Sequence, residues 1–151
     1  MTYATPAQFV ARFTEREAVM VSDRAGTGLV DEAQLTAGGL QPASEEIDSH
    51  LGRRYALPLA VGGVPMASPP AVLVGLCCDI ARYRLTGTEV QETDAIRRRY
   101  TDAVKALQLL ADGKTVFAES PDLVGGSSPN AQGASVRTNE RDRMFDRCGG
   151  Y

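Results

Sequence analysis

A chain of 151 residues with 43% hydrophobic residues has the size of one globular domain with appended segments, and it can bury a core. The formal net charge of -3 excludes the strongly basic composition that is typical of a dedicated nucleic-acid-binding domain. The chain has neither an apolar run of about 18 residues nor a basic and apolar leader, which predicts a protein that stays in the cytosol without a membrane anchor.

The first residues carry a strong signal for the start of a helix. Thr5 can cap the helix, Pro6 suits its first position because the missing N–H costs nothing there, and Gln8 completes a capping box. Apolar side chains then recur with helical spacing. A second, shorter helical turn is expected over residues 15–21.

A glycine-bearing loop over residues 22–31 precedes the next expected helix. Asp31 can cap this helix, which is expected to run on toward Tyr55. Its apolar stripe consists of Leu40, Ala43, Ile47 and Leu51. A kink or break is expected at Gly38, Gly39 and Pro42, because glycine costs about 1 kcal/mol and interior proline about 3 kcal/mol in a helix.

The second half of the body predicts a surface loop and two long helices. Residues 57–67 are rich in proline and glycine and are expected to form the loop. Ser68–Pro70 open the most apolar helix, which Gly87 stops, and Asp94 is expected to cap the last helix, which ends at Gly113. The buried positions expected on the first are Val72, Leu73, Leu76, Cys77, Ile80, Ala81 and Leu85. Those expected on the second are Ile96, Tyr100, Ala103, Val104, Leu107 and Leu110.

These elements predict an all-α fold. A small bundle of four to five helices is expected over residues 1–113, followed by a long extended tail over residues 114–151 that docks on a neighbour. Val116 and Phe117 are expected to form a short strand or an anchor at the hinge.

The sequence offers no constellation for catalysis, so no catalytic residue, metal site or cofactor is predicted. His50 is the only histidine, has no cysteine or carboxylate at ligand spacing, and is expected on the surface. No phosphate-binding loop or nucleophile elbow is present. Cys77 and Cys78 are expected to act as small hydrophobic residues, with at most one pointing squarely into the core.

One loop has the outline of a calcium site. Asp23 and Asp31 would take its first and ninth positions, but Ala25 and Thr27 replace acids and Gln34 stands where a bidentate glutamate is needed. A glycine turn shaped by the two aspartates is the preferred interpretation. A calcium-responsive binding module that uses the Asp23–Asp31 loop is kept as the alternative function.

Two runs of arginine allow more than one interpretation. Residues 97–99 spread around a helix and make no single phosphate-facing stripe, which favours a solvated or intersubunit face over contact with passing DNA. Residues 53–54 are similar.

The terminal peptide, residues 136–151, has too little apolar surface to fold by itself. It nevertheless combines balanced charge with aromatic residues, which is typical of a peptide docked on a protein surface. The predicted docking residues are Arg137, Arg141, Arg143, Phe145, Arg147 and Tyr151. We expect this peptide to gain its order against another subunit, which indicates an assembly component instead of an enzyme.

Several segments together resemble the Mu-like phage and prophage head–tail connector family. They are MTYATPAQFVARF at residues 1–13, the loop over 22–33, SEEID with the following LPL over 44–59, LCCDIARYRL over 76–85 and the terminal RMFDRCGGY. The resemblance covers about residues 1–113 in combined order.

The resemblance implies an α-helical adaptor in the neck of the virion, assembled in the host cytoplasm. Twelve copies would form a ring that joins the portal protein to the tail-completion or tail-terminator protein. The C-terminal tail of each copy would dock on the portal or on a neighbouring subunit. Genomic DNA would pass through the lumen without specific binding, as the acidic net charge allows.

Two departures from the family pattern bear on this expectation. Family members often carry an Asp-x-Asp-Gly-Asp-Gly loop, whereas Ala25 and Thr27 stand here in place of acids. Family terminal peptides tend to read Phe-x-Arg-Asp-x-Leu-Arg-Gly-Tyr, whereas this chain has Cys148 at the usual aspartate and lacks the leucine.

Overall fold

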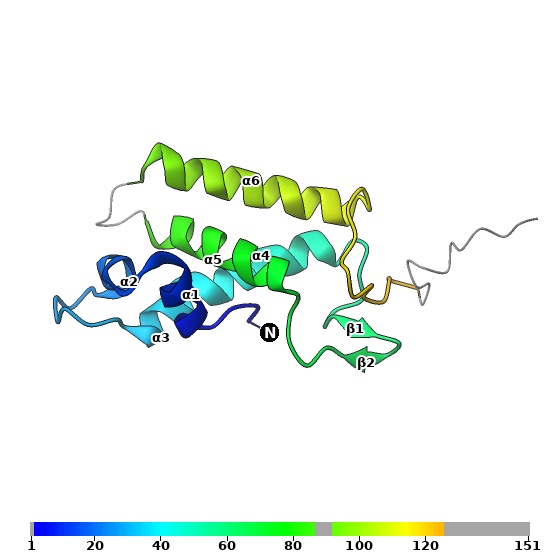
Figure 1. Cartoon of the computed structure of the whole chain (residues 1–151), viewed down its shortest axis with the longest axis horizontal. Coiled ribbons are helices and arrows are strands. Elements are labelled where there is room, and N and C mark those ends of the chain that lie inside the picture. The colour runs from blue at the N-terminus through cyan, green and yellow to red at the C-terminus, as the bar shows by residue number, and fades with distance from the viewer. Residues whose placement is uncertain (1, 87–91, 126–151) are drawn as a thin grey trace, which may run out of the picture.

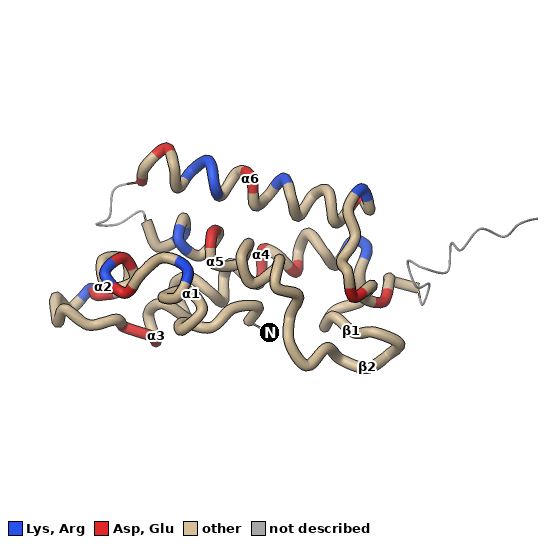
Figure 2. The backbone as a smooth tube through the Cα atoms, viewed as in Figure 1, with Lys and Arg blue, Asp and Glu red and all other residues tan. Residues whose placement is uncertain are grey.

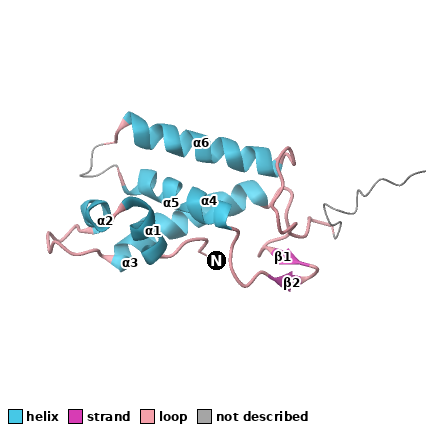
Figure 3. Ribbon diagram, in the orientation of Figure 1, coloured by secondary structure: helices cyan, strands magenta, loops and turns pink. Residues whose placement is uncertain are grey.

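The structure, a computed structural model, describes residues 2–86 and 92–125, and it confirms the all-α fold. Figures 1 and 3 show a bundle of helices with one small hairpin at one end. In chain order the elements are α1 (Pro6–Phe13), α2 (Glu15–Ser22), α3 (Glu32–Leu35), a π-helical stretch (Thr36–Leu40), α4 (Gln41–Leu51), β1 (Ala60–Val61), β2 (Val64–Pro65), α5 (Ala71–Leu85) and α6 (Asp94–Ala111). No helix among these residues is both long and apolar enough to cross a membrane.

Helix α5 lies at the centre of the bundle. It contacts α6, α4, the π-helical stretch, α1 and α2, and Figure 1 shows α6 running along it on one side. Because neighbours cover α5 from several directions, Cys77 and Cys78 are both buried. The expectation that at most one of them points into the core was therefore wrong. Val72 was also assigned wrongly, since 59% of its surface is exposed.

The predicted helix starts are confirmed at the N-terminus and at residue 31. Thr5 and Gln8 form the reciprocal capping box, with Pro6 as the first helical residue. Asp31 caps α3 by accepting a hydrogen bond from the backbone N–H of Gln34. At α6 the cap is Thr93 and not Asp94 as expected: the Thr93 hydroxyl accepts from the N–H of Ile96, and Asp94 is the first helical residue.

The helix that was predicted to follow Asp31 continues through Gly38 and Gly39, but it is irregular at this pair. The chain passes from α3 through the π-helical stretch into α4, so the wide turn lies immediately before Pro42. A wider helical turn absorbs the misfit of a proline, which lacks an N–H and crowds the preceding turn. The expected stripe is confirmed, since Leu40, Ala43, Ile47 and Leu51 are all fully buried.

Replacement by alanine is expected to have opposite effects on stability at the two glycines of the π-helical stretch. A Cβ at Gly38 would meet the mobile amide of Gln34, which can rotate away, so Gly38→Ala should stabilise the fold by up to about 1 kcal/mol. A Cβ at Gly39 would lie 2.7 Å from Cδ1 and 3.0 Å from Cγ of Leu85 at the buried contact with α5. Gly39→Ala should therefore cost about 1–3 kcal/mol, as overpacking does. Urea denaturation of the two variants tests the pair, and equal effects would contradict this account of the contact.

The segment expected to be a plain surface loop contains the β1–β2 hairpin. Ala60 pairs with Pro65 and Val61 with Val64 in antiparallel register. Gly62 and Gly63 form the turn with φ of 61° and 79°, a left-handed conformation that two-residue hairpin turns require. The sequence held this signal, since a Gly-Gly pair flanked by valines is a hairpin pattern.

Residues 114–125, which the sequence assigned to the tail, pack against the bundle. Gly113, with φ of 72°, ends the turn after α6. Phe117 and Pro121 are then buried, and Leu123 forms a bridge with Tyr55. Phe117 is thus the anchor that one of the two expectations proposed, and no strand includes it in the described part of the chain.

Candidate protein-docking surface

The six predicted docking residues, Arg137, Arg141, Arg143, Phe145, Arg147 and Tyr151, lie outside the described residues. Their role stays a prediction. The structure instead shows the surface that surrounds the last described residues, 121–125.

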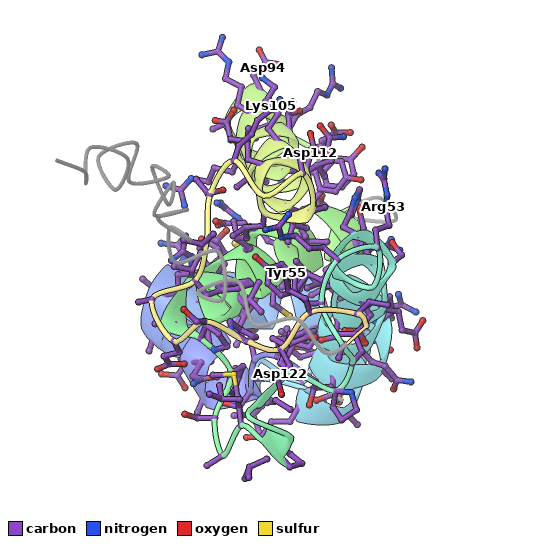
Figure 4. The ribbon with its side chains drawn as sticks, turned by 90° about the vertical axis from the view of Figure 1, so that its right-hand side faces the viewer. Arg53, Tyr55, Asp94, Lys105, Asp112 and Asp122 are labelled. Atoms are coloured by element: carbon purple, nitrogen blue, oxygen red, sulfur yellow. The ribbon has the colours of Figure 1, made fainter. Side chains whose placement is uncertain are left out.

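Most exposed large hydrophobic side chains of the described residues gather at one end of the molecule, the end that carries the hairpin. They are Leu57, Val61, Val64, Val72, Leu109, Val116 and Val124. Figure 4 looks onto this end, with Tyr55 in its interior and Asp122 near the hairpin. Met20 and Leu29 are exposed at the other end, where α2 and its following loop lie. Exposed apolar side chains therefore lie at both ends, and most of them are at the hairpin end.

An apolar groove of about 560 Å³ opens at the hairpin end. The start of α5, the last turns of α6 and residues 115–119 form its walls. Its rim carries Val72, Leu109 and Val116, which are 59%, 41% and 60% exposed. Pockets of this size and apolar character are typical of binding sites.

The local sequence explains how the groove forms. Gly113 turns the chain back over the ends of α5 and α6, and hydrogen bonds from Lys114 and Thr115 to the Leu109 carbonyl fix the turn. Phe117 then points inward while its neighbour Val116 points outward. One residue anchors the segment and the next one lines the groove.

Phe117 is held by an aromatic contact with Tyr55, which lies four residues after the end of α4. Its ring packs edge to face on Tyr55, with centroids 5.2 Å apart. Edge-to-face pairs stabilise beyond their buried area because the positive ring edge meets the negative face. The Arg54 guanidinium lies 5.9 Å from the centre of the same Tyr55 ring, next to Gly113.

A second set of contacts, made by Asp122, joins the end of the described chain to the hairpin. The Asp122 carboxylate accepts hydrogen bonds from the backbone N–H groups of Gly62 and Gly63, at 2.9 Å and 2.7 Å. The Asp122 N–H donates to the Ala60 carbonyl. Both contacts fix residues 121–124 beside the hairpin.

A shallower groove lies between the hairpin and the first one. Val61, Val64 and Met66 contribute to its lining, and Glu119 lines both grooves. Residues 57–70 contain no charged residue, and the hairpin is therefore tan throughout in Figure 2. Glu119 is exposed and makes no ion pair within the described residues. The two grooves are thus lined mainly by apolar side chains, and the carboxylate of Glu119 is available there to pair with a cationic group of a partner.

The Asp23 loop has the geometry of a turn that satisfies its own carboxylate. Asp23 accepts hydrogen bonds from the N–H groups of Thr27 and Gly28 and from the Thr27 hydroxyl. The Thr27 and Gly28 N–H groups lower the pKa of the Asp23 carboxyl by stabilising its charge. No three histidine, cysteine, aspartate or glutamate residues of the described chain are grouped to hold a metal ion. This matches the interpretation as a glycine turn.

Two arginines of the run over residues 97–99, and Arg12 of α1, make contacts within the fold. Arg97 pairs with Glu92 at 2.6 Å, which raises the Arg97 pKa. The Arg99 guanidinium lies 6.0 Å from the centre of the Phe13 ring. The Arg12 guanidinium donates two hydrogen bonds to the carboxylate of the nearly buried Asp79. The arginines of the run over residues 97–99 therefore lie on different faces of α6.

The groove at the ends of α5 and α6 was not predicted from the sequence, although one signal was present. Leu109 is apolar but falls outside the predicted stripe of its amphipathic helix, so it had to face something other than the core. Val72 gave no such signal, because α5 is apolar on nearly every side. Only the assembled ends of α5 and α6 identify both as groove residues.

Comparison with known proteins identifies the family of this chain. The family described as Bacteriophage Mu, Gp36 matches residues 3–134. The Mu-like prophage FluMu protein gp36 of Haemophilus influenzae is 34% identical over 120 residues, covering 80% of this chain and 78% of the relative. Gene product J of Escherichia phage Mu is 34% identical over 116 residues, covering 76% and 75% of the two chains. The chain therefore belongs to the bacteriophage Mu Gp36 family of Mu-like phages and prophages.

Proposed function

We propose that this protein is a structural connector of a Mu-like phage, which forms a ring between the portal protein and the tail-completion or tail-terminator protein. Its place is the neck of the virion. It acts by holding protein surfaces together and not by catalysing a reaction.

The observation that carries this proposal is the concentration of exposed apolar side chains at one end of the bundle, around a groove with a single available carboxylate. Exposed apolar patches of this kind mark protein–protein contacts. The exposed Met20 and Leu29 lie at the opposite end. Contacts between unlike ends close into a ring when the rotation between copies closes. We take the dodecamer, which would match portal symmetry, as the form to test by mass measurement with and without portal.

The terminal peptide supplies the second part of the proposal. It follows in sequence after residues 121–124, which Asp122 fixes beside the hairpin. Its arginine and aromatic residues belong to the types that dominate interface energies. The acidic net charge of the whole chain is consistent with a lumen through which DNA moves without sticking.

Deletion of residues 134–151 tests the connector function. The core cluster is built from residues between Tyr3 and Leu123, and the peptide has too little apolar surface to fold by itself, so the far-ultraviolet circular dichroism signal should remain nearly unchanged. Complementation of a prophage that lacks the gene should nevertheless yield heads and tails that stay unjoined in electron micrographs. Full joining by the truncated chain would refute the assigned role of the peptide.

A further inference from the structure

We propose that the groove formed by α5, α6 and residues 115–119 receives the C-terminal peptide of a second copy of this chain. Phe145 of that copy fills the groove, and an arginine beside it pairs with Glu119. The inference rests on the proposed function for the presence of a neighbouring copy. It deepens that function by naming the two surfaces that meet.

The groove is suited to an aromatic anchor. Its walls are predominantly apolar, its volume is about 560 Å³, and Val72, Leu109 and Val116 stand exposed around it. An aromatic side chain buries a large area and loses few rotatable bonds on binding, which favours it as an interface anchor. The described residues place no aromatic side chain in the groove other than Phe117, which is part of its wall.

The terminal peptide has a two-residue periodicity that matches this surface. In an extended chain, alternate residues point to the same face. One set of alternate positions holds Arg137, Arg141, Arg143, Phe145, Arg147 and Tyr151. The other set holds the acids Glu140, Asp142 and Asp146 together with Met144. An extended peptide therefore presents one face that is both cationic and aromatic.

The body offers the complementary charge. Residues 115–125 contain two acids, Glu119 and Asp122, and no lysine or arginine. Asp122 is occupied by its hydrogen bonds to the hairpin, whereas Glu119 stands at the junction of the two grooves without an ion-pair partner in the described part of the chain. Arginine and carboxylate form strong, directional hydrogen bonds. A Phe145 seated in the groove would bring Arg143 or Arg147 toward Glu119.

The chain is long enough to make this contact between copies. From Gly125 to Phe145 there are 20 residues. A flexible segment of that length spans about 25 Å on average and up to about 70 Å when extended. Helix α6, with 18 residues, is about 27 Å long. The peptide can therefore reach the groove of a neighbour that stands one body width away.

Sedimentation of the purified full-length chain over a range of concentrations tests the anchor. Phe145→Ala should weaken self-association by about 30-fold, as loss of an interface anchor does. Met144→Ala is the matched control, because its side chain belongs to the opposite face, and it should change the association by less than about threefold. Equal effects of the two substitutions, or association that does not depend on Phe145, would overturn the proposal.

Mixing two defective variants separates a neighbour's peptide from the chain's own. Val116→Lys disables the groove and leaves the peptide intact, whereas Phe145→Ala does the reverse. At a concentration where the wild type associates and the weakened variants do not, each variant alone should be monomeric. The mixture should form a one-to-one complex that grows no further, because one functional contact remains. No complex in the mixture would show that each peptide occupies its own groove, which would overturn the assignment to a second copy. Leu109→Lys serves as a second groove variant if Val116→Lys lowers the melting temperature.

A charge swap tests the pairing. Glu119→Arg should weaken association by about 10-fold, as expected for a charged pair at an interface. Combination with Arg143→Glu or with Arg147→Glu should restore it, and rescue by neither would overturn the pairing. Wild-type protein that stays monomeric at every concentration would also overturn the inference. In that case, failure of the truncated chain to join heads and tails would still uphold the connector function.

Discussion

Replacement of Phe117 by alanine is expected to lower the free energy of unfolding by about 3–5 kcal/mol, the range for a buried phenylalanine. The ring is only 5% exposed and packs edge to face on Tyr55. Since Phe117 anchors the segment that walls the groove, its loss should also release that segment. Chemical denaturation measures the first effect, and faster proteolytic cleavage within residues 114–125 reports the second.

The neighbouring residue provides the control for this prediction. Val116→Ala removes a side chain that is 60% exposed, so it should change stability by less than about 0.5 kcal/mol. Proteolysis of residues 114–125 should then proceed as in the wild type. Similar losses for the two substitutions would contradict the assignment of Phe117 as anchor and Val116 as groove lining.

A loss of stability at alkaline pH is the second large effect that we expect. Burial, with the neighbouring Cys77 as a smaller cause, raises the pKa of Cys78 from 9.0 to about 12. Burial also raises the pKa of Cys77, and burial with the hydrogen bond to Asp48 raises that of Tyr3. The folded state thus resists ionisation of groups that ionise freely once the chain unfolds.

The sign follows from proton linkage. For Cys78, the contribution of the protonated thiol to the free energy of unfolding is fully present below the thiol pKa of the unfolded chain, near 9. It is lost as the pH rises toward the pKa in the folded state, about 12. The free energy of unfolding should therefore fall between pH 9 and 11, with a slope of up to about 1.4 kcal/mol per pH unit for each such group. Urea titrations at a series of pH values give this slope.

Cys78→Ala isolates one contribution. This variant should show a shallower decline above pH 9, while its stability should run parallel to that of the wild type between pH 6 and 8. A Cys148→Ser variant allows a second measurement, because only the two buried thiols remain. Those thiols should resist a thiol reagent at pH 8 until the protein unfolds, and rapid labelling of the native protein would contradict their burial.

The all-α class and most helix boundaries could be predicted because their signals are local. Thr5 and Gln8 form the capping box around Pro6 within four residues of chain, and Asp31 caps an N–H only three residues further on. The stripe of Leu40, Ala43, Ile47 and Leu51 follows from helical spacing alone, and all four are buried. The hairpin could have been found in the same way, because a Gly-Gly pair between valines sets its turn.

The errors fell where burial depends on partners that are distant in the sequence. Cys77 and Cys78 are both buried because several elements surround α5, which its own periodicity does not report. Val72 is exposed because, within the described part of the chain, no element covers the first turn of α5 on that side. Thr93 and Asp94 are both good caps, and backbone geometry chose Thr93.

The amino-acid sequence by itself determined the helices, their caps, the glycine turn at Asp23 and the amphiphilic character of the terminal peptide, because each depends on neighbours within a few residues. The tertiary structure alone decided where apolar side chains stay uncovered. The groove needs the start of α5, the end of α6 and residues 115–119 at one place, and the start of α5 lies some 40 residues before the other two segments along the chain. A surface assembled from such separate pieces exists only after the core has fixed how the helices pack.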